Sequence, residues 1–255
     1  MIKNNYFVDI IMPNFNKSDY LDVGINSILN QTFKNWRLYI IDDCSKDNSL
    51  NVLKKFKKFK KIKIIKLRKN KGPGFCRNYG LKISKSKYIS FMDSDDYWKT
   101  DKLEKQINFM KINNLDFTYT DYIPFIQKKN KKKFLNKTNL KKTFNFNEFT
   151  KNSSINTTTM IITRSSIKGL KFKKISKLED YLFKCELLKR GTQAYKFNAS
   201  SAYYRILSNS RSSQKLQNIF YLWKINKSYN KFNFLENMLS IFMISLNSIK
   251  KYGFK

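Results

Sequence analysis

The first hundred residues of the sequence alternate short β-rich runs with segments of helical periodicity. We predict strands at 6–12, 36–41, 62–67 and 87–92, with helices that follow Ser18 and cover 47–60, 75–83 and 103–110. Strands separated by helices of this length form right-handed βαβ units, and such units build a parallel sheet. In such a sheet, ligands bind beyond the carboxyl ends of the strands. The pattern therefore predicts an α/β fold with its site at that edge.

Segments rich in polar residues follow three of the predicted strands, so we expect them to meet at that edge. They are Pro13, Asn14, Phe15 and Asn16, then Asp42 and Asp43, then Asp93, Ser94, Asp95 and Asp96. The three carboxylates of the last segment form a negative cluster that a cation or a proton must relieve. Oxygen ligands of this kind select Mg²⁺ or Mn²⁺, which can bridge to a diphosphate. The alternative is an acidic turn that caps the next helix.

Two further positions favour a nucleotide at the same edge. A carboxylate at Asp42 or Asp43 can accept hydrogen bonds from a base N–H or from ribose hydroxyls, although the pair by itself also suits an ordinary turn. Arg77 begins a helix just after a Gly-Pro-Gly turn at 72–74, and the N–H groups at a helix N-terminus suit a phosphate. The alternative for Arg77 is a surface arginine.

The composition excludes several classes of chemistry. The 255-residue chain contains no histidine, which removes Ser-His-Asp and Cys-His nucleophiles, histidine-bound zinc and histidine acid–base catalysis. The isolated cysteines, Cys44, Cys76 and Cys185, form no CxxC pair and favour a reduced cytosolic setting. Proton transfer must therefore fall to Asp, Glu, Tyr, Lys or Cys.

A formal charge of +34 invites a nucleic-acid or anionic-membrane partner. Only seven of the 52 basic residues are arginine, however, and A/T-rich codon bias is an equally good source of the lysine. Two basic runs without an acid stand out, at 54–71 and 128–142. Such runs are usually solvated faces or loops, but each basic residue near a membrane adds about 1 kcal/mol of attraction to anionic lipid.

The rest of the chain gives weaker signals. An apolar segment at 116–126 is followed by predicted strands at 158–163 and 194–206 and predicted helices at 178–190, 218–229 and 234–249. Asp9 interrupts the N-terminal apolar run well short of a signal-peptide core, and no segment approaches the roughly 20 apolar residues of a membrane span. We therefore expect a location in the cytoplasm or at the cytoplasmic face of the inner membrane.

A series of motifs runs in order through the first 110 residues. They are VDIIMPNFN at 8–16, SILNQTFKNW at 27–36, IDDCSKDNS at 41–49, RN at 77–78, YISFMDSDDYW at 88–98 and KLEKQ at 102–106. In sequence and spacing, this series resembles the opening of family 2 glycosyltransferases with the GT-A fold. Each motif alone is weak, whereas the ordered series is specific for the family.

The resemblance implies a fold and a division of the chain. The GT-A fold is a Rossmann-like, mixed but mainly parallel sheet flanked by helices, and here it would carry a helical C-terminal extension. The implied glycosyltransferase domain covers 1–210, with a nucleotide-sugar-binding half at 1–115 and an acceptor-binding half at 116–210, and the extension covers 211–255.

The resemblance also implies a donor site. The donor is a nucleotide-sugar, usually a UDP-sugar, whose base would lie near Asp43 and be flanked by the backbone around Pro13. Asp93 and Asp95 would form the motif for Mn²⁺ or Mg²⁺, with Asp95 as the direct ligand. The donor-binding set that follows is Pro13, Asn14, Phe15, Asn16, Asp43, Arg77, Asp93, Ser94 and Arg205.

Residues in the second half would supply the catalytic base and further charge. Asp180, in the acidic pair with Glu179, matches the aspartate that usually accepts the proton of the acceptor hydroxyl. Arg205 and the segment 208–213 resemble a basic stretch that closes over the diphosphate. The metal and either arginine, at position 77 or 205, would then offset the charge on the leaving group.

The expected function is transfer of one sugar per binding event, with inversion. Neither the Gln-x-x-Arg-Trp signature of processive synthases nor their membrane spans are present, and Cys44 replaces a glycine that is common after the acidic pair. The enzyme would be a hexosyl- or N-acetylhexosaminyltransferase of bacterial lipooligosaccharide, capsule or O-antigen synthesis. Its acceptor would be a glycan or a lipid-linked glycan, with the C-terminal aromatic residues either against a membrane or in ordinary helix packing.

Two other functions remain open at this stage. A sugar-phosphate nucleotidyltransferase also uses a Rossmann-like sheet with carboxylate-bound Mg²⁺, but it normally has a glycine-rich loop after the first strand, where this chain has Pro13 to Asn16. A basic nucleic-acid-binding protein would account for the charge of +34. It would not account for carboxylates at successive strand ends, and we regard nucleic acid as a disfavoured partner.

Overall fold

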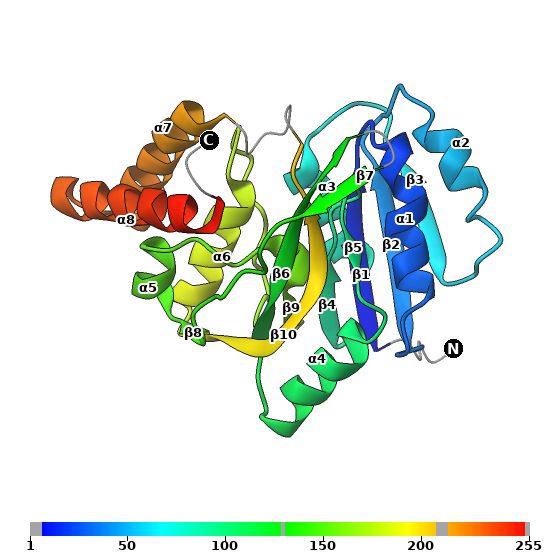
Figure 1. Ribbon diagram of the computed structural model, residues 1–255, viewed down its shortest axis with the longest axis horizontal. Helices are drawn as coiled ribbons and strands as arrows, with labels where there is room; N and C mark the ends of the chain where they lie inside the picture. The colour runs from blue at the N-terminus through cyan, green and yellow to red at the C-terminus, as the bar shows by residue number, and fades with distance from the viewer. Residues whose placement is uncertain (1–6, 129–130, 208–213, 253–255) are drawn as a thin grey trace.

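The computed structural model describes residues 7–128, 131–207 and 214–252, and it contains a mixed sheet with helices on both faces (Figure 1). Within these residues the sheet has ten strands, eight of which follow in the order β3-β2-β1-β4-β9-β6-β10-β5. β7 pairs with β6, and β8 pairs with β10. One sheet therefore runs through both of the halves that the sequence suggests.

Four parallel strands form the N-terminal part of the sheet. They are β3 (Ile62–Lys66), β2 (Trp36–Asp42), β1 (Val8–Asn14) and β4 (Tyr88–Phe91). Every residue of β1 is buried, as expected for a central strand covered on both faces. β1 and β2 end in register, with Asn14 opposite Asp42, so the polar segments that follow them begin side by side.

Helices connect these strands and cover both faces. They are α1 (Ser18–Leu29), α2 (Ser49–Lys54) and α3 (Pro73–Ile83). α1 and α2 pack together on one face. The chain reverses its direction across the sheet between β3 and β4, so a right-handed connection places α3 on the other face. α3 packs closely on β1, since a Cβ added at Gly80 would lie 2.5 Å from Ile11 Cγ2.

The second half of the sheet mixes parallel and antiparallel strands. They are β5 (Tyr97–Trp98), β6 (Phe117–Lys128), β7 (Lys131–Phe134), β8 (Thr143–Phe144), β9 (Ile161–Thr163) and β10 (Ala194–Arg205). β9 runs antiparallel to β4 and β6, and β10 runs parallel to β6. The helices of this half are α4 (Lys102–Ile112), α5 (Phe146–Thr150), the 3₁₀ turn η1 (Thr157–Thr159) and α6 (Glu179–Lys189).

Two C-terminal helices pack beside α5 and α6, far from the N-terminal strands (Figure 1). They are α7 (Lys215–Ile225), which continues into a π-helical turn at Asn226–Asn230, and α8 (Phe234–Tyr252). Ser240 of α8 donates a hydrogen bond to Thr150 O of α5 over 2.6 Å. Among the helices that the structure describes, none has both the length and the apolar character needed to cross a membrane.

The structure confirms the predicted fold class and most of the predicted elements, with ends shifted by a few residues. Two predictions are wrong in extent. The helix predicted at 47–60 ends at Lys54, because the lysine-rich segment after it forms turns that bury Phe56. The strand predicted at 158–163 begins at Ile161, because the threonines before it form η1. The sequence does not predict β5, β7, β8 or α5, which are too short to show a period.

Candidate active site

The segments after β1 and β2 meet in a buried hydrogen-bond network. The Asp42 carboxylate accepts hydrogen bonds from Asn14 Nδ2 over 2.8 Å, from Ser45 Oγ over 2.6 Å and from Ser45 N over 3.0 Å. These bonds replace the water that the charge of the fully buried Asp42 would otherwise bind. Asp42 therefore holds the turn in shape and is not accessible to a ligand.

Asp43 joins the ends of three segments. Its N–H donates to Asn14 O over 2.7 Å, and its carboxylate oxygens accept from Lys71 N over 2.8 Å and Gly72 N over 2.7 Å. Since Gly72 is the N-cap of α3, the Asp43 carboxylate fixes the loop that opens this helix beside the end of β1. Cys44 adopts a φ of 62°, a left-handed conformation that glycine would take without strain.

The segment after β1 lies against the same turn. Pro13 and Asn14 are the last two residues of β1. The side-chain oxygen of Asn16 accepts a hydrogen bond from Lys46 N over 2.8 Å, whereas Phe15 leaves 43% of its surface exposed. Pro13, Phe15 and Asn16 therefore share one edge of the sheet with Asp43.

The acidic tetrad forms a tight turn between β4 and β5, in which Asp96 N donates to Asp93 O over 3.0 Å. It does not cap the next helix, because α4 begins behind its own N-cap residue, Asp101. Asp93 and Asp95 keep 34% and 21% of their side-chain surface exposed, whereas Ser94 and Asp96 are buried. Two carboxylates of this turn are thus accessible from outside.

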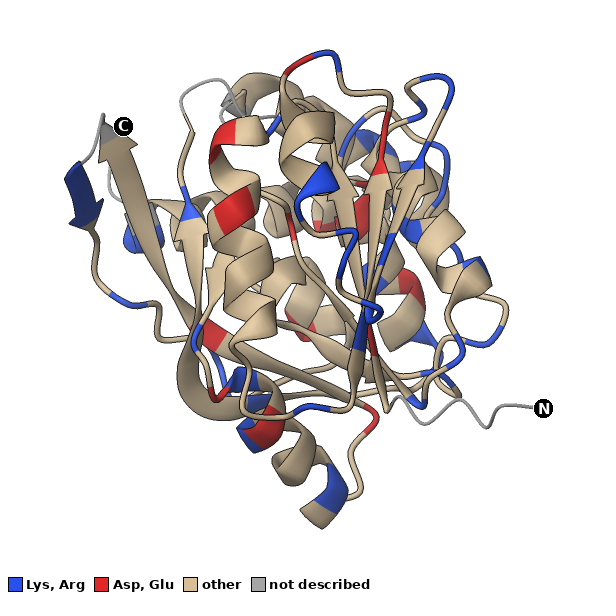
Figure 2. Ribbon diagram, turned by 90° about the vertical axis from the view of Figure 1, so that its right-hand side faces the viewer, with Lys and Arg blue, Asp and Glu red and all other residues tan. Residues whose placement is uncertain are grey.

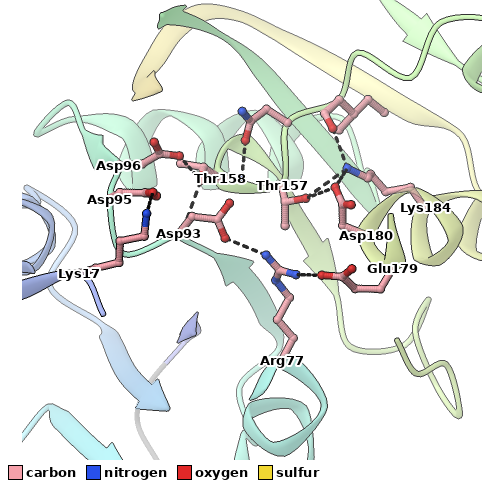
Figure 3. Close-up of polar contacts among 12 residues, drawn as sticks. Lys17, Arg77, Asp93, Asp95, Asp96, Thr157, Thr158, Glu179, Asp180 and Lys184 are labelled. Carbon is pink, nitrogen blue, oxygen red and sulfur yellow. Dashed lines mark hydrogen bonds and ion pairs between the residues drawn. The ribbon is translucent and has the colours of Figure 1, made fainter. Parts of the chain in front are cut away.

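Arg77 joins the acidic turn to α6 (Figure 3). Its Nη2 pairs with Asp93 Oδ1 at 2.7 Å, and its Nη1 pairs with Glu179 Oε1 at 3.3 Å. Burial alone would lower the pKa of Arg77, but the two carboxylates raise this pKa above its usual range, so the side chain stays charged. Its Nε has no hydrogen-bond partner within the described chain. Arg77 is therefore a buried bridge and not a surface arginine.

Asp95 is held from two sides. Lys17, from the loop after β1, pairs through Nζ with Asp95 Oδ2 at 2.8 Å (Figure 3). Arg205, at the end of β10, donates from Nε to Asp95 O over 2.9 Å, and its guanidinium lies over the Tyr20 ring. Arg205 is buried, and burial lowers its pKa. It supports the turn in this arrangement, and the segment 208–213 predicted to act with it lies outside the described residues.

Asp96 anchors the turn to the interior. Its carboxylate accepts hydrogen bonds from Arg205 N over 2.9 Å and from Thr158 Oγ1 over 2.7 Å. Burial, together with the negative charges of Asp95 and Asp93, raises the pKa of Asp96 well above its usual range. Of the three acids in the tetrad, Asp96 is therefore the one that holds the turn to the interior.

Asp180 lies in the first turn of α6, directly after Glu179. Its Oδ2 accepts hydrogen bonds from Lys184 Nζ over 2.9 Å and from Thr157 Oγ1 over 3.1 Å, and 36% of its side-chain surface is exposed (Figure 3). Burial alone would raise the pKa of Asp180, but the charges of Lys184 and Arg77 outweigh this effect and hold the pKa below its usual range. Asp180 is thus an ionised carboxylate with one oxygen fixed.

Sequence reasoning does not single out Lys17, Thr157 or Lys184, which complete these contacts. Lys184 lies four residues after Asp180, a spacing that places both on one helix face, so the sequence does contain a signal for this pair. Lys17 and Thr157 come from a loop and a 3₁₀ turn that only the fold brings to the acids. No sequence pattern points to either of them.

Asp93 and Asp95 are two partly exposed carboxylates, the first paired with Arg77 and the second with Lys17. Mg²⁺ is usually held by one or two carboxylates together with phosphate oxygens and water. No group of three or more acids or cysteines is placed to hold a metal within 7–128, 131–207 and 214–252. An ion at this turn would therefore depend on ligands that a bound donor brings.

Comparison with known proteins gives consistent results. The model of the family described as Glycosyl transferase family 2 matches residues 9–170. The chain is 30% identical over 246 residues to TuaG of Bacillus subtilis, a putative teichuronic acid biosynthesis glycosyltransferase, with 96% of each chain covered. It is 32% identical over 251 residues to WfaP of Escherichia coli, a UDP-Glc:alpha-D-GlcNAc-diphosphoundecaprenol beta-1,3-glucosyltransferase, with 97% of this chain and 96% of WfaP covered.

Solved structures share the fold at lower sequence identity. Staphylococcus aureus TarS 1-349 in complex with UDP-GlcNAc has a TM-score of 0.72 and 18% identity, covering 96% of this chain and 73% of that one. The mannosyltransferase PcManGT from Pyrobaculum calidifontis, in complex with GDP-Man and Mn²⁺, has a TM-score of 0.69 and 10% identity, covering 99% and 78%. The same sheet and helices therefore occur in proteins that hold a nucleotide-sugar.

Proposed function

This chain belongs to glycosyltransferase family 2 and has the GT-A fold, and from that premise we propose that it transfers one sugar from a UDP-sugar to a hydroxyl of a lipid-linked glycan. WfaP, whose name specifies UDP-Glc and a diphosphoundecaprenol-linked acceptor, supports this choice, as does TarS with its bound UDP-GlcNAc. The product would enter a bacterial surface polysaccharide, the class of polymer for which TuaG is named. A lipid-linked acceptor would bring the enzyme to the cytoplasmic face of the membrane.

One observation carries this proposal: contacts between charged side chains link the acidic turn to the first turn of α6. Asp93 pairs with Arg77, Arg77 pairs with Glu179, and Asp180 follows Glu179 in the chain. A sugar transferase needs its leaving-group site and its base on opposite sides of the anomeric carbon, at a fixed separation. The bridge from Asp93 through Arg77 to Glu179 is a means of fixing the separation between the acidic turn and Asp180.

On the donor side, we assign the base and ribose to the edge formed by Asp43 and the segment after β1. Asp43 is buried at 2% exposure and two backbone N–H groups hold its carboxylate, so a base N–H or a ribose hydroxyl would reach it only at the remaining acceptor positions of that carboxylate. Pro13, Asn14, Phe15 and Asn16 would flank the base, with Phe15 as the exposed aromatic surface.

The diphosphate would lie at the acidic turn. Asp93 and Asp95 would hold Mn²⁺ or Mg²⁺, with Asp95 as the direct ligand and the buried Ser94 setting their spacing. When bound, such an ion offsets the negative charge of the departing diphosphate. Lys17 and Arg77 place two further positive charges at the same turn, so the diphosphate would find cations there from the chain itself.

Asp180 would act as the base. It accepts the proton of the acceptor hydroxyl while that oxygen forms a bond to the anomeric carbon and the bond from this carbon to the diphosphate oxygen breaks. Attack opposite the leaving group inverts the configuration, through a transition state with oxocarbenium character. A low pKa keeps Asp180 ionised at neutral pH, and a weak base suffices because the hydroxyl becomes acidic only as the new bond forms.

Thermal unfolding with a panel of UDP-, GDP-, CMP- and dTDP-sugars, each with and without Mn²⁺, tests the donor site. We expect one class, the UDP-sugars, to raise the melting temperature of the wild type in the presence of the metal. Asp95→Ala should abolish this rise, whereas Asp22→Asn, which alters an exposed acid on α1, should leave it unchanged. Equal stabilisation of Asp95→Ala would contradict the metal assignment.

Release of UDP in the presence of a short-chain diphosphate-linked GlcNAc acceptor tests the base. Asp180→Asn should retain the donor-induced rise in melting temperature but lose about 10²-fold or more in kcat, the size expected for loss of a general base. Wild-type turnover by Asp180→Asn would remove Asp180 from the mechanism and leave the donor assignment standing.

A further inference from the structure

The C-terminal helices present an apolar surface that no other part of the described chain covers. Ten of the fifteen exposed large hydrophobic side chains among the described residues lie between Leu216 and Leu246. On α8 they are Phe234, Leu235, Met238, Leu239, Phe242 and Leu246. This spacing places all six on one side of the helix. We call this surface, with its continuation on α7, the apolar face.

The inward side of α8 is mixed, because Ile241 and Ile244 pack against the core beside buried polar residues. Asn237 and Ser240 are buried and point at the rest of the protein. Asn226 Nδ2 donates to Asn237 Oδ1 over 3.1 Å and to Ser240 Oγ over 2.9 Å, and Tyr181 of α6 donates to Asn226 Oδ1 over 3.0 Å. Hydrogen bonds and the packing of Ile241 and Ile244 therefore hold α8 in place without the six exposed apolar residues, which are left on the outer side of the helix.

The apolar face is continuous over both helices. The rings of Trp223 on α7 and Phe234 on α8 meet edge to face with centroids 5.5 Å apart. Leu216, Ile219 and Phe220 extend the exposed stripe along α7. The two helices thus form one apolar surface rather than two isolated patches, and a surface of this kind marks an interaction site.

Charge around the apolar face selects the partner. Exposed Lys224, Lys227, Lys231 and Lys250 lie on or next to these helices. The sequence has a single acid between 214 and 252, Glu236, whose carboxylate is engaged by Asn233 N over 2.8 Å. An apolar stripe bordered by lysines matches the boundary between acyl chains and anionic headgroups of a bilayer.

The apolar face begins beside the candidate active site. Lys177 lies just before Glu179 and Asp180, and its Nζ donates to Gln217 Oε1 of α7 over 2.7 Å and to Gln214. We propose that the apolar face lies in the interface of an anionic membrane and holds the first turn of α6 at the height of a lipid-linked acceptor. The location of the acceptor rests on the proposed function, whereas membrane binding itself does not.

Flotation with lipid vesicles tests the proposal without donor or acceptor. The full-length protein should float with vesicles that contain phosphatidylglycerol and remain unbound with phosphatidylcholine alone. Leu235→Glu combined with Phe242→Glu should weaken binding by about tenfold or more, since two apolar side chains leave the interface. The matched control is Ile112→Glu combined with Phe134→Glu, which changes two exposed apolar residues on α4 and β7 and should bind as the wild type does.

Three outcomes would overturn the proposal. The first is equal binding of both double variants, and the second is absence of binding to phosphatidylglycerol vesicles. The third is a wild-type dimer in sedimentation that only Leu235→Glu combined with Phe242→Glu dissociates. That third result would assign the apolar face to a second copy of this chain. Melting curves should show that both double variants fold, because all four side chains are exposed.

Activity separates this proposal from the catalytic one. With a water-soluble acceptor the apolar-face variant should turn over as the wild type does, and with a vesicle-bound acceptor it should be slower by about the factor lost in binding. If the wild type is inactive on both acceptors but still binds vesicles, the proposed function fails and the membrane surface stands.

Discussion

At the scale of single residues, the pair of Lys184 and Asp180 defines how the candidate base is held. Lys184 is buried and donates to Asp180 Oδ2, Thr157 Oγ1 and Ile155 O, so one ammonium fixes the carboxylate relative to the 3₁₀ turn. Its charge also lowers the pKa of Asp180. Lys184 is therefore a positioning residue whose removal should alter both the turnover number and its pH dependence.

We predict that Lys184→Met lowers kcat by about tenfold or more and moves the acidic limb of the kcat profile to higher pH. The sign follows from the charge: without the ammonium, the pKa of Asp180 rises, and the base is protonated at a higher pH than in the wild type. Lys189→Met on the same helix is the control and should keep the wild-type limb. A profile of Lys184→Met that falls without moving would mean that the lysine acts on folding alone.

Cys44 stores strain at the end of β2. Its φ of 62° costs a residue with a Cβ about 1 kcal/mol, and glycine would avoid this cost while losing more entropy on folding. We predict that Cys44→Gly raises the melting temperature, by at most about 2 °C because the entropy loss offsets part of the relieved strain. Lys46→Gly, where no left-handed conformation is needed, should lower it. A drop with Cys44→Gly would show that the turn is held by something other than backbone preference.

The clustered acids identify this site in the sequence. The sequence does not show which of these acids is exposed and which is buried. Asp42 and Asp43 are both buried, yet Asp42 is hydrogen-bonded within its own turn and Asp43 to the loop before α3. Asp96 is buried, whereas Asp95 keeps 21% of its side-chain surface exposed. Which acid faces outward depends on the partners that fold around it, and for Asp96 the partner is Thr158, more than sixty residues away.

At the scale of elements, the glutamines of the motifs at 27–36 and 102–106 hold α1 and α4 in place by hydrogen bonds. Gln31 Nε2 donates to Lys99 O over 2.7 Å, and its Oε1 accepts from Leu103 N over 3.0 Å, which joins the end of α1 to the start of α4. Gln106 Nε2 donates to Thr159 O over 3.1 Å, which joins α4 to η1. Sequence similarity locates such residues, and only the fold separates them from residues that touch a ligand.

Lys102, in the first turn of α4, is a buried lysine that forms no ion pair with any residue the structure describes. Its Nζ donates to Gln106 Oε1 over 3.0 Å and lies 4.2 Å from the centroid of the Trp98 ring, and burial lowers its pKa to about 7. Because an unfolded lysine titrates near 10.4, the unfolded state binds more protons between about pH 7 and pH 10. The stability of the wild type should therefore rise with pH across this range.

We predict that Lys102→Met removes this rise and stabilises the protein by about 2 kcal/mol at pH 7. The gain is smaller than burial alone implies, since the ring of Trp98 and the Gln106 amide already favour the charged form. Urea unfolding at pH 7 and pH 9.5 measures both effects, with the exposed Lys105→Met as the control. A less stable Lys102→Met at pH 7 would show that the cation–π contact outweighs the cost of burial.

The lysine runs at 54–71 and 128–142 each contain an edge strand of the sheet, β3 in the first and β7 in the second. β3 pairs only with β2, and β7 pairs only with β6, so within the described chain both are edge strands. β7 is Lys-Lys-Lys-Phe, with all four residues exposed to solvent at least in part, and β3 carries Lys63 and Lys66. Lysines on an edge oppose pairing with another sheet. The sequence predicts solvated runs but not this position, because β7 is too short to be recognised.

At the scale of the whole molecule, ordered motifs predict the fold because each lies at a strand end or helix start of one sheet. The register of β1 with β2 and of β1 with β4 then brings their carboxyl ends together, as the parallel arrangement requires. The second half is less predictable, since its short antiparallel strands leave little periodicity. For the C-terminal helices the sequence leaves membrane contact and ordinary helix packing both open, because an amphipathic pattern does not tell which side of a helix faces the protein.

Because of the net charge of +34, we expect added salt to stabilise the folded protein. Figure 2 shows lysine and arginine on many elements of the side that faces the viewer, so repulsion on this side is spread over several elements. Repulsion between like charges destabilises the compact state, and salt screens it over about 10 Å at 0.1 M. Exposed ion pairs weaken with salt as well, but each contributes at most about 1 kcal/mol.

We therefore predict that the melting temperature rises by several degrees between about 20 mM and about 300 mM NaCl, and that potassium chloride gives the same curve. Sodium sulfate at equal ionic strength should match both if general screening is the cause. A larger rise with sulfate that Arg77→Met abolishes would instead show an anion bound at the acidic turn, because Arg77 is the buried cation there. A falling melting temperature would mean that ion pairs, and not repulsion, dominate the electrostatics of this fold.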